Sequence, residues 1–306
     1  MTRAVVFAYH DVGVRCLSVA LAHALDVRLV VTHRDDPKEN VWFASVERLA
    51  REHGIDVETP EDPGQLLARL QSLAPDFLFS FYYRLMLSPR ILACARRGAF
   101  NMHGSLLPKY RGRAPVNWAV LRGERETGAK LHEMVAKPDA GRIVDQMAVP
   151  ILPDDLAVEV LRKVTVAAEV VLDRALPRLI AGDARLAPQD LAQGSYFGAR
   201  RPEDGRIDWT RGAREIHDLV RAVAPPYPGA FTPLDGARLR LLRTRVGAAR
   251  GSMGAAQLLV EGADRLVARC ADGASLEIIE ADLDARAFPA AAFRERFGRG
   301  PVPLGS

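Results

Sequence analysis

The amino-acid sequence predicts an α/β protein with an open, mostly parallel β-sheet, followed by a smaller β-rich domain. The chain has 306 residues, of which 48% are hydrophobic, and this length suits one large domain or two smaller ones. Short β-branched runs alternate with helical patterns over the first 200 residues, as in sheets whose parallel strands are connected by helices. Short apolar runs separated by turns then follow towards the C-terminus.

Periodicity places the elements of the first 200 residues. The predicted strands cover residues 4–8, 27–32, 77–82 and 99–103. The predicted helices cover residues 14–25, 42–51 and 156–179. The last helix begins after Asp154 and Asp155, whose charges suit a helix N-terminus. Ligands bind beyond the carboxyl ends of the strands in such sheets, so the segments after residues 81 and 100 are the first candidates for a site.

The segment 202–205 marks the boundary between two predicted domains, residues 1–200 and residues 201–306. Beyond it we expect a short helix at residues 213–222 and a proline-rich turn at residues 225–229. The predicted strands of this part cover residues 238–246, 258–260, 266–268 and 276–279. The second domain is therefore predicted to be small and β-barrel-like, similar to an OB-like domain.

Composition and charge argue against several classes of protein. The chain has 42 Lys and Arg against 38 Asp and Glu, a net charge of +4, and residues 201–306 carry 16 Arg, no Lys and 14 acidic residues, or +2. Neither part is a basic polyelectrolyte, so we expect no nucleic-acid partner. No stretch approaches the roughly 20 apolar residues of a spanning helix, so we expect no membrane insertion. The three scattered cysteines fit a cytoplasmic protein.

Several motifs of cofactor and metal chemistry are absent from the sequence. Gly13 stands alone after the first predicted strand, so the chain lacks a glycine-rich dinucleotide fingerprint. It also lacks a P-loop, an HExxH motif and a GxSxG motif. The seven histidines are scattered singly, and we therefore expect no metal. These absences favour general acid–base or electrostatic chemistry.

Two polar residues, Asn101 and His103, end the predicted strand 99–103. Strand alternation points both side chains to the same side, where an amide can stabilise an oxyanion and an imidazole can carry a proton. Asp139 follows an apolar strand predicted at residues 131–135, and we expect its carboxylate to approach His103 and raise the histidine pKa. His132, on that same strand, is interpreted as a hydrogen-bonded structural residue. From spacing alone, a polar strand end without catalytic function remains the alternative.

The segments 101–108 (NMHGSLLP) and 139–141 (DAG) together resemble the folate-dependent formyltransferase family. Within that family, the segments 7–13 (FAYHDVG), 80–84 (SFYYR) and 105–115 (SLLPKYRGRAP) look like the branch that formylates UDP-4-amino-4-deoxy-L-arabinose in lipid A modification and polymyxin resistance. The resemblance extends from residue 1 to about residue 280. It implies a Rossmann-like formyltransferase fold and 10-formyltetrahydrofolate as the formyl donor.

The resemblance also implies roles for individual residues. His103 is implied to donate a proton to the leaving folate nitrogen, Asn101 to stabilise the tetrahedral oxyanion, and Asp139 to orient His103 and raise its pKa. The implied folate contacts are Leu85, Met86, Leu87, Arg113, Val135, Ala136, Lys137, Pro138 and Asp139. The apolar residues 85–87 suit a pterin or aryl group, with ordinary core packing as the alternative. At Lys137 and Pro138 we expect backbone contacts.

Candidate residues for the nucleotide sugar lie in loops beside this strand end and near the domain boundary. They are Tyr82, Tyr83, Tyr110, Arg111 and Arg201. A guanidinium fork fits a carboxylate or diphosphate, and an aromatic ring can stack on uracil or sugar. Solvated loops and ordinary packing are the alternatives for these residues.

The expected partners are small molecules, a folate and a nucleotide sugar. A separate decarboxylase is also expected in the pathway, because the usual family member carries a decarboxylase domain that 306 residues leave no room for. The alternatives are a methionyl-tRNA formyltransferase, a formyltransferase for another nucleotide-linked amino sugar, a formyltetrahydrofolate hydrolase, and a folate- or nucleotide-binding regulator. The weak net charge argues against tRNA, a polyanion.

Overall fold

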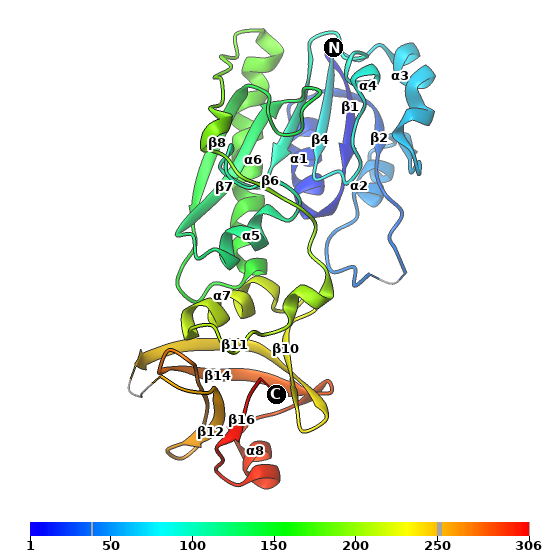
Figure 1. Ribbon diagram of the computed structural model, residues 1–306. Helices are drawn as coiled ribbons and strands as arrows, with labels where there is room; N and C mark the ends of the chain where they lie inside the picture. Colours follow the sequence, from blue (N-terminus) through cyan, green and yellow to red (C-terminus); the bar gives the residue numbers. More distant parts are fainter. Residues whose placement is uncertain (38, 250–252, 306) are drawn as a thin grey trace. The chain divides into compact units, whose positions relative to one another are not determined.

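The structure is a computed structural model that describes residues 1–37, 39–249 and 253–305. The chain divides into two compact units (Figure 1). Unit 1 comprises residues 1–115, 126–150 and 161–198, and unit 2 comprises residues 116–125, 151–160 and 199–306. Within the described ranges, no helix has the length and apolar character that crossing a membrane requires.

Unit 1 is built on a seven-stranded sheet with the strand order β3-β2-β1-β4-β5-β7-β8. Its strands are β1 (Arg3–Ala8), β2 (Asp26–Val31), β3 (Val57–Glu58), β4 (Phe77–Phe81), β5 (Gly98–His103), β7 (Glu126–Glu133) and β8 (Ile143–Pro150). The first five pair in parallel, whereas β7 is antiparallel to both β5 and β8. The predicted open, mostly parallel sheet is confirmed. Its parallel part and its antiparallel part meet at β5.

Helices cover both faces of this sheet. They are α1 (His10–Ala22), α2 (Val46–Glu52), η1 (Pro63–Leu66), α3 (Leu67–Leu73), α4 (Pro89–Leu92) and α6 (Ala157–Ala181), with the short helix η2 (Leu191–Gln193). On one face, Leu70 of α3 and Ile91 of α4 pack with Val5 and Phe7 of β1 in a buried core. On the other face, α1 contacts β1, β2 and β4, and ion pairs join α1 to α6. The short strands β6 (Arg111–Gly112) and β9 (Tyr196–Phe197) pair separately.

The helix α2 begins later than the sequence predicts. The predicted helix starts at residue 42, but α2 starts at Val46. The hydroxyl of Ser45 accepts a hydrogen bond from the backbone N–H of Arg48 at 3.2 Å, and Ser45 has extended backbone geometry. A serine in this position caps a helix N-terminus, so the capping bond overrides the apolar spacing that suggested an earlier start.

Unit 2 contains a curled antiparallel sheet in the order β10-β11-β14-β13-β12-β16, with β15 on β14. Its strands are β10 (Ala230–Leu234), β11 (Ala237–Ala249), β12 (Gln257–Glu261), β13 (Arg265–Arg269), β14 (Ala274–Leu283), β15 (Arg286–Ala287) and β16 (Val302–Pro303). Its helices include η3 (Pro202–Gly205), α7 (Ala213–Val223) and α8 (Ala290–Phe297), and α5 (Pro115–Leu121) lies almost wholly in this unit. The predicted β-rich C-terminal domain is confirmed.

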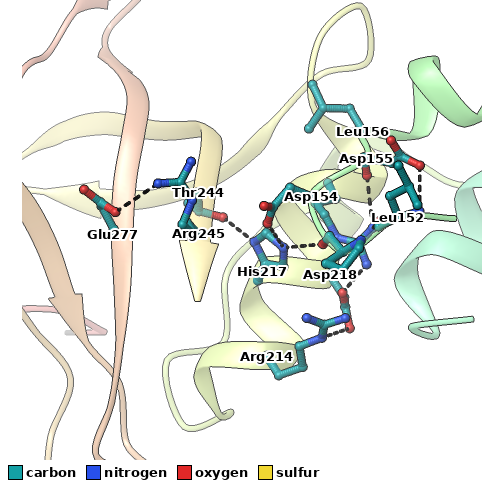
Figure 2. Close-up of polar contacts among 12 residues, drawn as sticks. Leu152, Asp154, Asp155, Leu156, Arg214, His217, Asp218, Thr244, Arg245 and Glu277 are labelled. Carbon is teal, nitrogen blue, oxygen red and sulfur yellow. Dashed lines mark hydrogen bonds and ion pairs between the residues drawn. The ribbon is translucent and has the colours of Figure 1, made fainter. Parts of the chain in front are cut away.

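A buried polar cluster in unit 2 joins α7 to β11 and to the segment that precedes α6 (Figure 2). The Nδ1 atom of His217 lies 2.9 Å from the hydroxyl of Thr244, and its Nε2 atom lies 3.0 Å from the carbonyl oxygen of Pro153. Arg221 donates a hydrogen bond to the Asp218 carboxylate. Burial lowers the pKa of His217, so the ring is neutral near pH 7. Both of its nitrogens are occupied by hydrogen bonds within unit 2.

Candidate active site

The antiparallel pairing of β5 with β7 sets the geometry of the site in unit 1. In this register Asn101 faces His132, and His103 faces Lys130. Directly opposed residues of neighbouring strands lie on the same face of a sheet, so all four polar side chains share one face. His103, His132 and Lys130 are 7%, 1% and 3% exposed. The sheet therefore brings together two buried imidazoles, a buried ammonium and the partly buried amide of Asn101 where its parallel and antiparallel strands meet.

The amide of Asn101 is oriented by His132. The His132 Nδ1 atom lies 2.9 Å from the backbone carbonyl oxygen of Glu133, and a carbonyl only accepts, so Nδ1 carries the ring proton. The other ring nitrogen, Nε2, lies 3.1 Å from Nδ2 of Asn101 and accepts a hydrogen bond from it. The remaining N–H of the Asn101 amide is thereby held as a preorganised donor.

The ring of His103 is held from one side and faces a carboxylate on the other. Its Nε2 atom donates to the backbone carbonyl oxygen of Tyr110 at 2.9 Å, and its Nδ1 atom lies 3.6 Å from Oδ1 of Asp139. Burial lowers the pKa of His103; Asp139 and the Tyr110 carbonyl oppose this effect, while His132 and Lys130 add to it. Asp139 thus raises the His103 pKa, as the sequence predicts, but burial outweighs this effect, so the pKa lies below its ordinary value.

Asp139 stays charged although it is largely buried. Its Oδ2 atom accepts a hydrogen bond from the Gly112 backbone N–H at 2.9 Å, and its Oδ1 atom lies 3.6 Å from both His103 Nδ1 and His132 Nε2. Burial raises the pKa of the Asp139 carboxyl, but the imidazoles of His103 and His132 when they are protonated, together with the Gly112 N–H, lower it well below its usual range. A carboxylate fixed in this way can stabilise a positive charge that arises on His103.

The turn that carries Asp139 is held against the end of β7. A side chain at Gly141 would collide with the backbone carbonyl oxygen of Glu133, so only glycine permits this close approach. The amide of Gln189 donates to the backbone carbonyl oxygen of Asp139 at 3.2 Å. Asp139 itself has a left-handed backbone, with φ of 53°, which Asp tolerates better than most residues. These contacts explain why Asp139 returns to the strand end.

Tyr82 lies against the segment that follows His103. A Cβ atom on Gly104 would collide with the hydroxyl oxygen of Tyr82 and lie 3.0 Å from the ring carbon that bears it. Tyr82 follows β4, the parallel neighbour of β5, and has φ of 59°. The structure thus places one of the predicted acceptor residues beside the end of β5, and it explains the glycine at position 104.

The predicted folate residues lie in different environments. Leu87 is 8% exposed and belongs to the core of unit 1, as the core-packing alternative holds. Met86 is 67% exposed and Val135 is 39% exposed, so both offer apolar surface to a ligand. The guanidinium of Arg113 donates to the backbone carbonyl oxygen of Arg84 at 3.2 Å. Met86 and Val135 are therefore exposed apolar side chains, whereas Leu87 is part of the core.

Two of the predicted acceptor tyrosines are engaged by other rings. Tyr83 stacks on His33, with ring centroids 4.2 Å apart, and burial raises its pKa to about 12. Tyr110 stacks on Phe197, with centroids 5.3 Å apart, and it is 8% exposed. The rings of both residues therefore contribute to packing, and Tyr110 reaches the site through its backbone carbonyl.

The two predicted acceptor arginines belong to different units. Arg111 lies in β6 of unit 1, and its Nε atom is buried with no hydrogen-bond partner among the residues that the structure describes. Arg201 lies in unit 2, where its backbone N–H donates to the carboxylate of Asp204 at 2.7 Å. A buried guanidinium N–H without a partner is free to donate to a ligand, so Arg111 is the stronger of the two candidates.

Lys130 was missed by sequence reasoning, and the link between His132 and Asn101 was not foreseen. Lys130 and His132 are two residues apart on β7, and that spacing places them on one face of a strand. The signal was present, but their opposition to His103 and Asn101 depends on the β5–β7 register. Within the described parts of the chain, no group of three or more His, Cys, Asp or Glu residues is suited to hold a metal ion.

Comparison with known protein families shows which family the chain belongs to. Residues 15–176 match the family described as "Formyl transferase", and residues 200–297 match "Formyl transferase, C-terminal domain". The first match alone covers more than half of the chain. The protein therefore belongs to the formyl transferase family.

Solved structures with the same fold include two sugar-related enzymes. An N-formyltransferase from Helicobacter canadensis, in complex with folinic acid and dTDP-3-aminofucose, has a TM-score of 0.74 and 20% identity, covering 94% of this chain and 100% of that one. WlaRD, a sugar 3N-formyl transferase with dTDP and 5-N-formyl-THF, has a TM-score of 0.72 and 19% identity, with coverages of 94% and 99%. Glycinamide ribonucleotide transformylase 1 from Symbiobacterium toebii has a TM-score of 0.53 and 22% identity, with coverages of 62% and 95%.

Proposed function

We propose that this protein transfers the formyl group of 10-formyltetrahydrofolate to the 4-amino group of UDP-4-amino-4-deoxy-L-arabinose, in lipid A modification and polymyxin resistance. The observation that carries the proposal is the grouping of Asn101, His103 and Asp139 at the end of β5 in a formyl transferase. Two proteins of the same fold were crystallised with a formyl-folate and with a dTDP sugar or dTDP, which supports a nucleotide-linked amino sugar as the acceptor class. The UDP-linked pentose as the particular acceptor is supported by the resemblance of the segments 80–84 and 105–115 to the branch that formylates it.

Asn101 acts in the first step of the proposed reaction. The neutral amine of the sugar attacks the formyl carbon, a C–N bond forms, and the formyl oxygen becomes an oxyanion. The free N–H of the Asn101 amide, whose orientation His132 fixes, donates to this oxyanion. One preorganised donor of this kind is worth roughly 2.7–4 kcal/mol of barrier.

His103 moves the proton in the second step. Because burial keeps the imidazole neutral at rest, its Nδ1 atom can accept the proton that the attacking amine loses. The Asp139 carboxylate, 3.6 Å from Nδ1, stabilises the imidazolium while it exists. The imidazolium then protonates N10 of the folate as the bond between N10 and the formyl carbon breaks. The products are tetrahydrofolate and the formamido sugar, and His103 returns to its neutral form.

The proposed contacts divide between the two substrates. For the folate we propose the accessible apolar residues Met86 and Val135, with the backbone of residues 135–139. For the nucleotide sugar we propose Tyr82, which lies beside the end of β5, and the buried guanidinium N–H of Arg111. We also propose that a separate decarboxylase acts in the same pathway.

An acceptor panel tests the proposed function. The protein is incubated with 10-formyltetrahydrofolate and UDP- or dTDP-linked amino sugars, with methionyl-tRNA and a no-amine reaction alongside, and products are weighed by mass spectrometry. The proposal expects a formyl group on UDP-4-amino-4-deoxy-L-arabinose and no folate turnover without amine. Product only on a dTDP sugar contradicts the UDP-linked pentose but retains a sugar N-formyltransferase, the second candidate that the dTDP-bound structures favour. Product only on tRNA, or folate hydrolysis without amine, contradicts both.

A further inference from the structure

Lys130 is a buried cation at the site that the mechanism above does not use. Its side chain is 3% exposed, and it lies opposite His103 in the β5–β7 register. The ammonium donates a hydrogen bond to the backbone carbonyl oxygen of Leu107, in the loop that follows β5. Among the residues that the structure describes, no carboxylate lies within ion-pair distance of this ammonium. Lys130 therefore places a positive charge in the site without a countercharge of its own.

Burying a charged lysine at this position has an energetic cost. Burial lowers the pKa of Lys130 to about 8, because removing an ammonium from water disfavours its charge. The hydrogen bond to the Leu107 carbonyl offsets part of this cost. A methionine of similar length would lack both the charge and this hydrogen bond, whereas an arginine would keep the charge.

The charge of Lys130 acts on the neighbouring imidazole. The groups that face His103 are the carboxylate of Asp139, the imidazole of His132, the backbone carbonyl of Tyr110 and the ammonium of Lys130. Asp139 and the carbonyl favour a protonated ring, whereas burial, His132 and Lys130 oppose it. Lys130 is mostly protonated at pH 7, so its positive charge opposes the effect of the Asp139 carboxylate on the His103 ring.

We propose that Lys130 is a positioning residue for formyl transfer: its ammonium, anchored by the Leu107 carbonyl beside His103, keeps the imidazole uncharged between turnovers and promotes release of the proton to the leaving nitrogen. The inference rests on the proposed function, because it assigns a role within that reaction. Lys130 acts through His103 and contacts neither substrate. The anchored carbonyl also holds the loop after β5 in place.

The pH dependence of kcat/KM in Lys130→Met and Lys130→Arg tests the proposal. At each pH between 5 and 7.5, the kcat/KM of each variant is divided by the kcat/KM of wild type. This ratio cancels the titration of the substrate amine. Removing the cation raises the pKa of His103, so the Lys130→Met ratio is expected to fall by about threefold or more at the acid end of this range relative to pH 7.5. The Lys130→Arg ratio stays flat. A flat Lys130→Met ratio, even with uniformly lower activity, overturns the proposal.

A titration of His103 by NMR gives a second readout that does not depend on turnover. The His103 ring signal is assigned with His103→Asn, and its pKa is expected to be higher in Lys130→Met, or in Lys130→Gln, than in wild type. Equal values overturn the proposal. If neither variant folds, wild type decides: a second inflection of the His103 signal near pH 8, where Lys130 discharges, supports it, and no inflection there overturns it. Failure of the acceptor panel leaves this test intact, so the two hypotheses fail separately.

Discussion

Each unit of the molecule buries a histidine near a carboxylate and a cation, but the two surroundings differ. In unit 2, both ring nitrogens of His217 have hydrogen-bond partners at 2.9 and 3.0 Å, and Arg221 is paired with a carboxylate (Figure 2). In unit 1, Nδ1 of His103 faces Asp139 at 3.6 Å, beyond hydrogen-bond distance, and Lys130 is bound only by a carbonyl. The first arrangement fixes structure, whereas the second leaves a ring nitrogen able to take up a proton.

The largest expected effect comes from removing the oxyanion donor of unit 1. Asn101→Ala is expected to lower the rate of formyl transfer at least about a hundredfold, since one preorganised donor contributes roughly 2.7–4 kcal/mol. The melting temperature should change little, because Asn101 is only partly buried. Single-turnover assays measure the rate of formyl transfer, and calorimetry measures the melting temperature. A rate near wild type contradicts the role given to this amide.

Asp139→Asn removes the charge that faces His103 and keeps the shape of the side chain. Asn tolerates the left-handed backbone and can still accept the hydrogen bond from Gly112, so the turn is retained. The imidazolium then loses its stabilising carboxylate, and the rate is expected to fall about 10- to 100-fold. Stopped-flow or quenched assays report the loss. An Asp139→Asn rate equal to wild type shows that the carboxylate does not act on the proton transfer.

Gly104→Ala tests the packing of Tyr82 against the end of β5. The added methyl group collides with the Tyr82 hydroxyl, so either Tyr82 or the His103 backbone must move. A displacement near 1 Å can reduce a rate by up to about a hundredfold, and we expect about tenfold here. Tyr82→Phe in the same chain removes the colliding oxygen and should restore part of the activity. Equal rates for Gly104→Ala and wild type contradict the close approach.

The smallest expected effect concerns the stability of the fold and extends the comparison to a third histidine, His10, which is largely but not fully buried. Burial lowers the pKa of His10 to about 4; Asp11 opposes this effect and Arg84 adds to it. The folded pKa lies below the unfolded value of 6.5, so the unfolded chain binds the extra proton. Stability is therefore full above pH 6.5 and falls by roughly 3 kcal/mol as the pH approaches 4.

Thermal unfolding between pH 4 and pH 7 measures this dependence. In His10→Asn, whose side chain tolerates the left-handed backbone at this position, the fall in melting temperature should be shallower than in wild type. His23→Asn is the matched control, since His23 lies at the end of α1 with its ring paired to Asp173 on the surface. Identical slopes for His10→Asn and wild type contradict a buried neutral His10.

The sequence predicts the two polar residues at the end of β5 in unit 1, but it does not predict the residues that lie opposite them. Alternation along residues 99–103 places Asn101 and His103 on one side, as the structure has it. Their neighbours, His132 and Lys130, come from an antiparallel strand whose register no local pattern specifies. Burial depends on that same packing, so the sequence indicated the attraction of Asp139 for His103 but not the larger opposing effect of burial.

The division into units also depends on contacts between distant parts of the chain. Residues 116–125 and 151–160 group with unit 2, although they lie between segments of unit 1. One such contact is the hydrogen bond at 2.8 Å from the Asn117 amide to the backbone carbonyl oxygen of Ala222. Local periodicity indicates strands and helices, whereas it contains no information on contacts between residues about a hundred positions apart.

The comparison of His103→Ala with His217→Ala in one formyl-transfer assay tests the central claim most directly. Both substitutions remove a buried histidine, so the variants are matched in kind. His103→Ala should stay folded and lose at least about a hundredfold in rate per folded molecule, while His217→Ala should transfer formyl at close to the wild-type rate per folded molecule even though its melting temperature falls. If His103→Ala formylates the amino sugar at nearly the wild-type rate, the proposed mechanism is wrong.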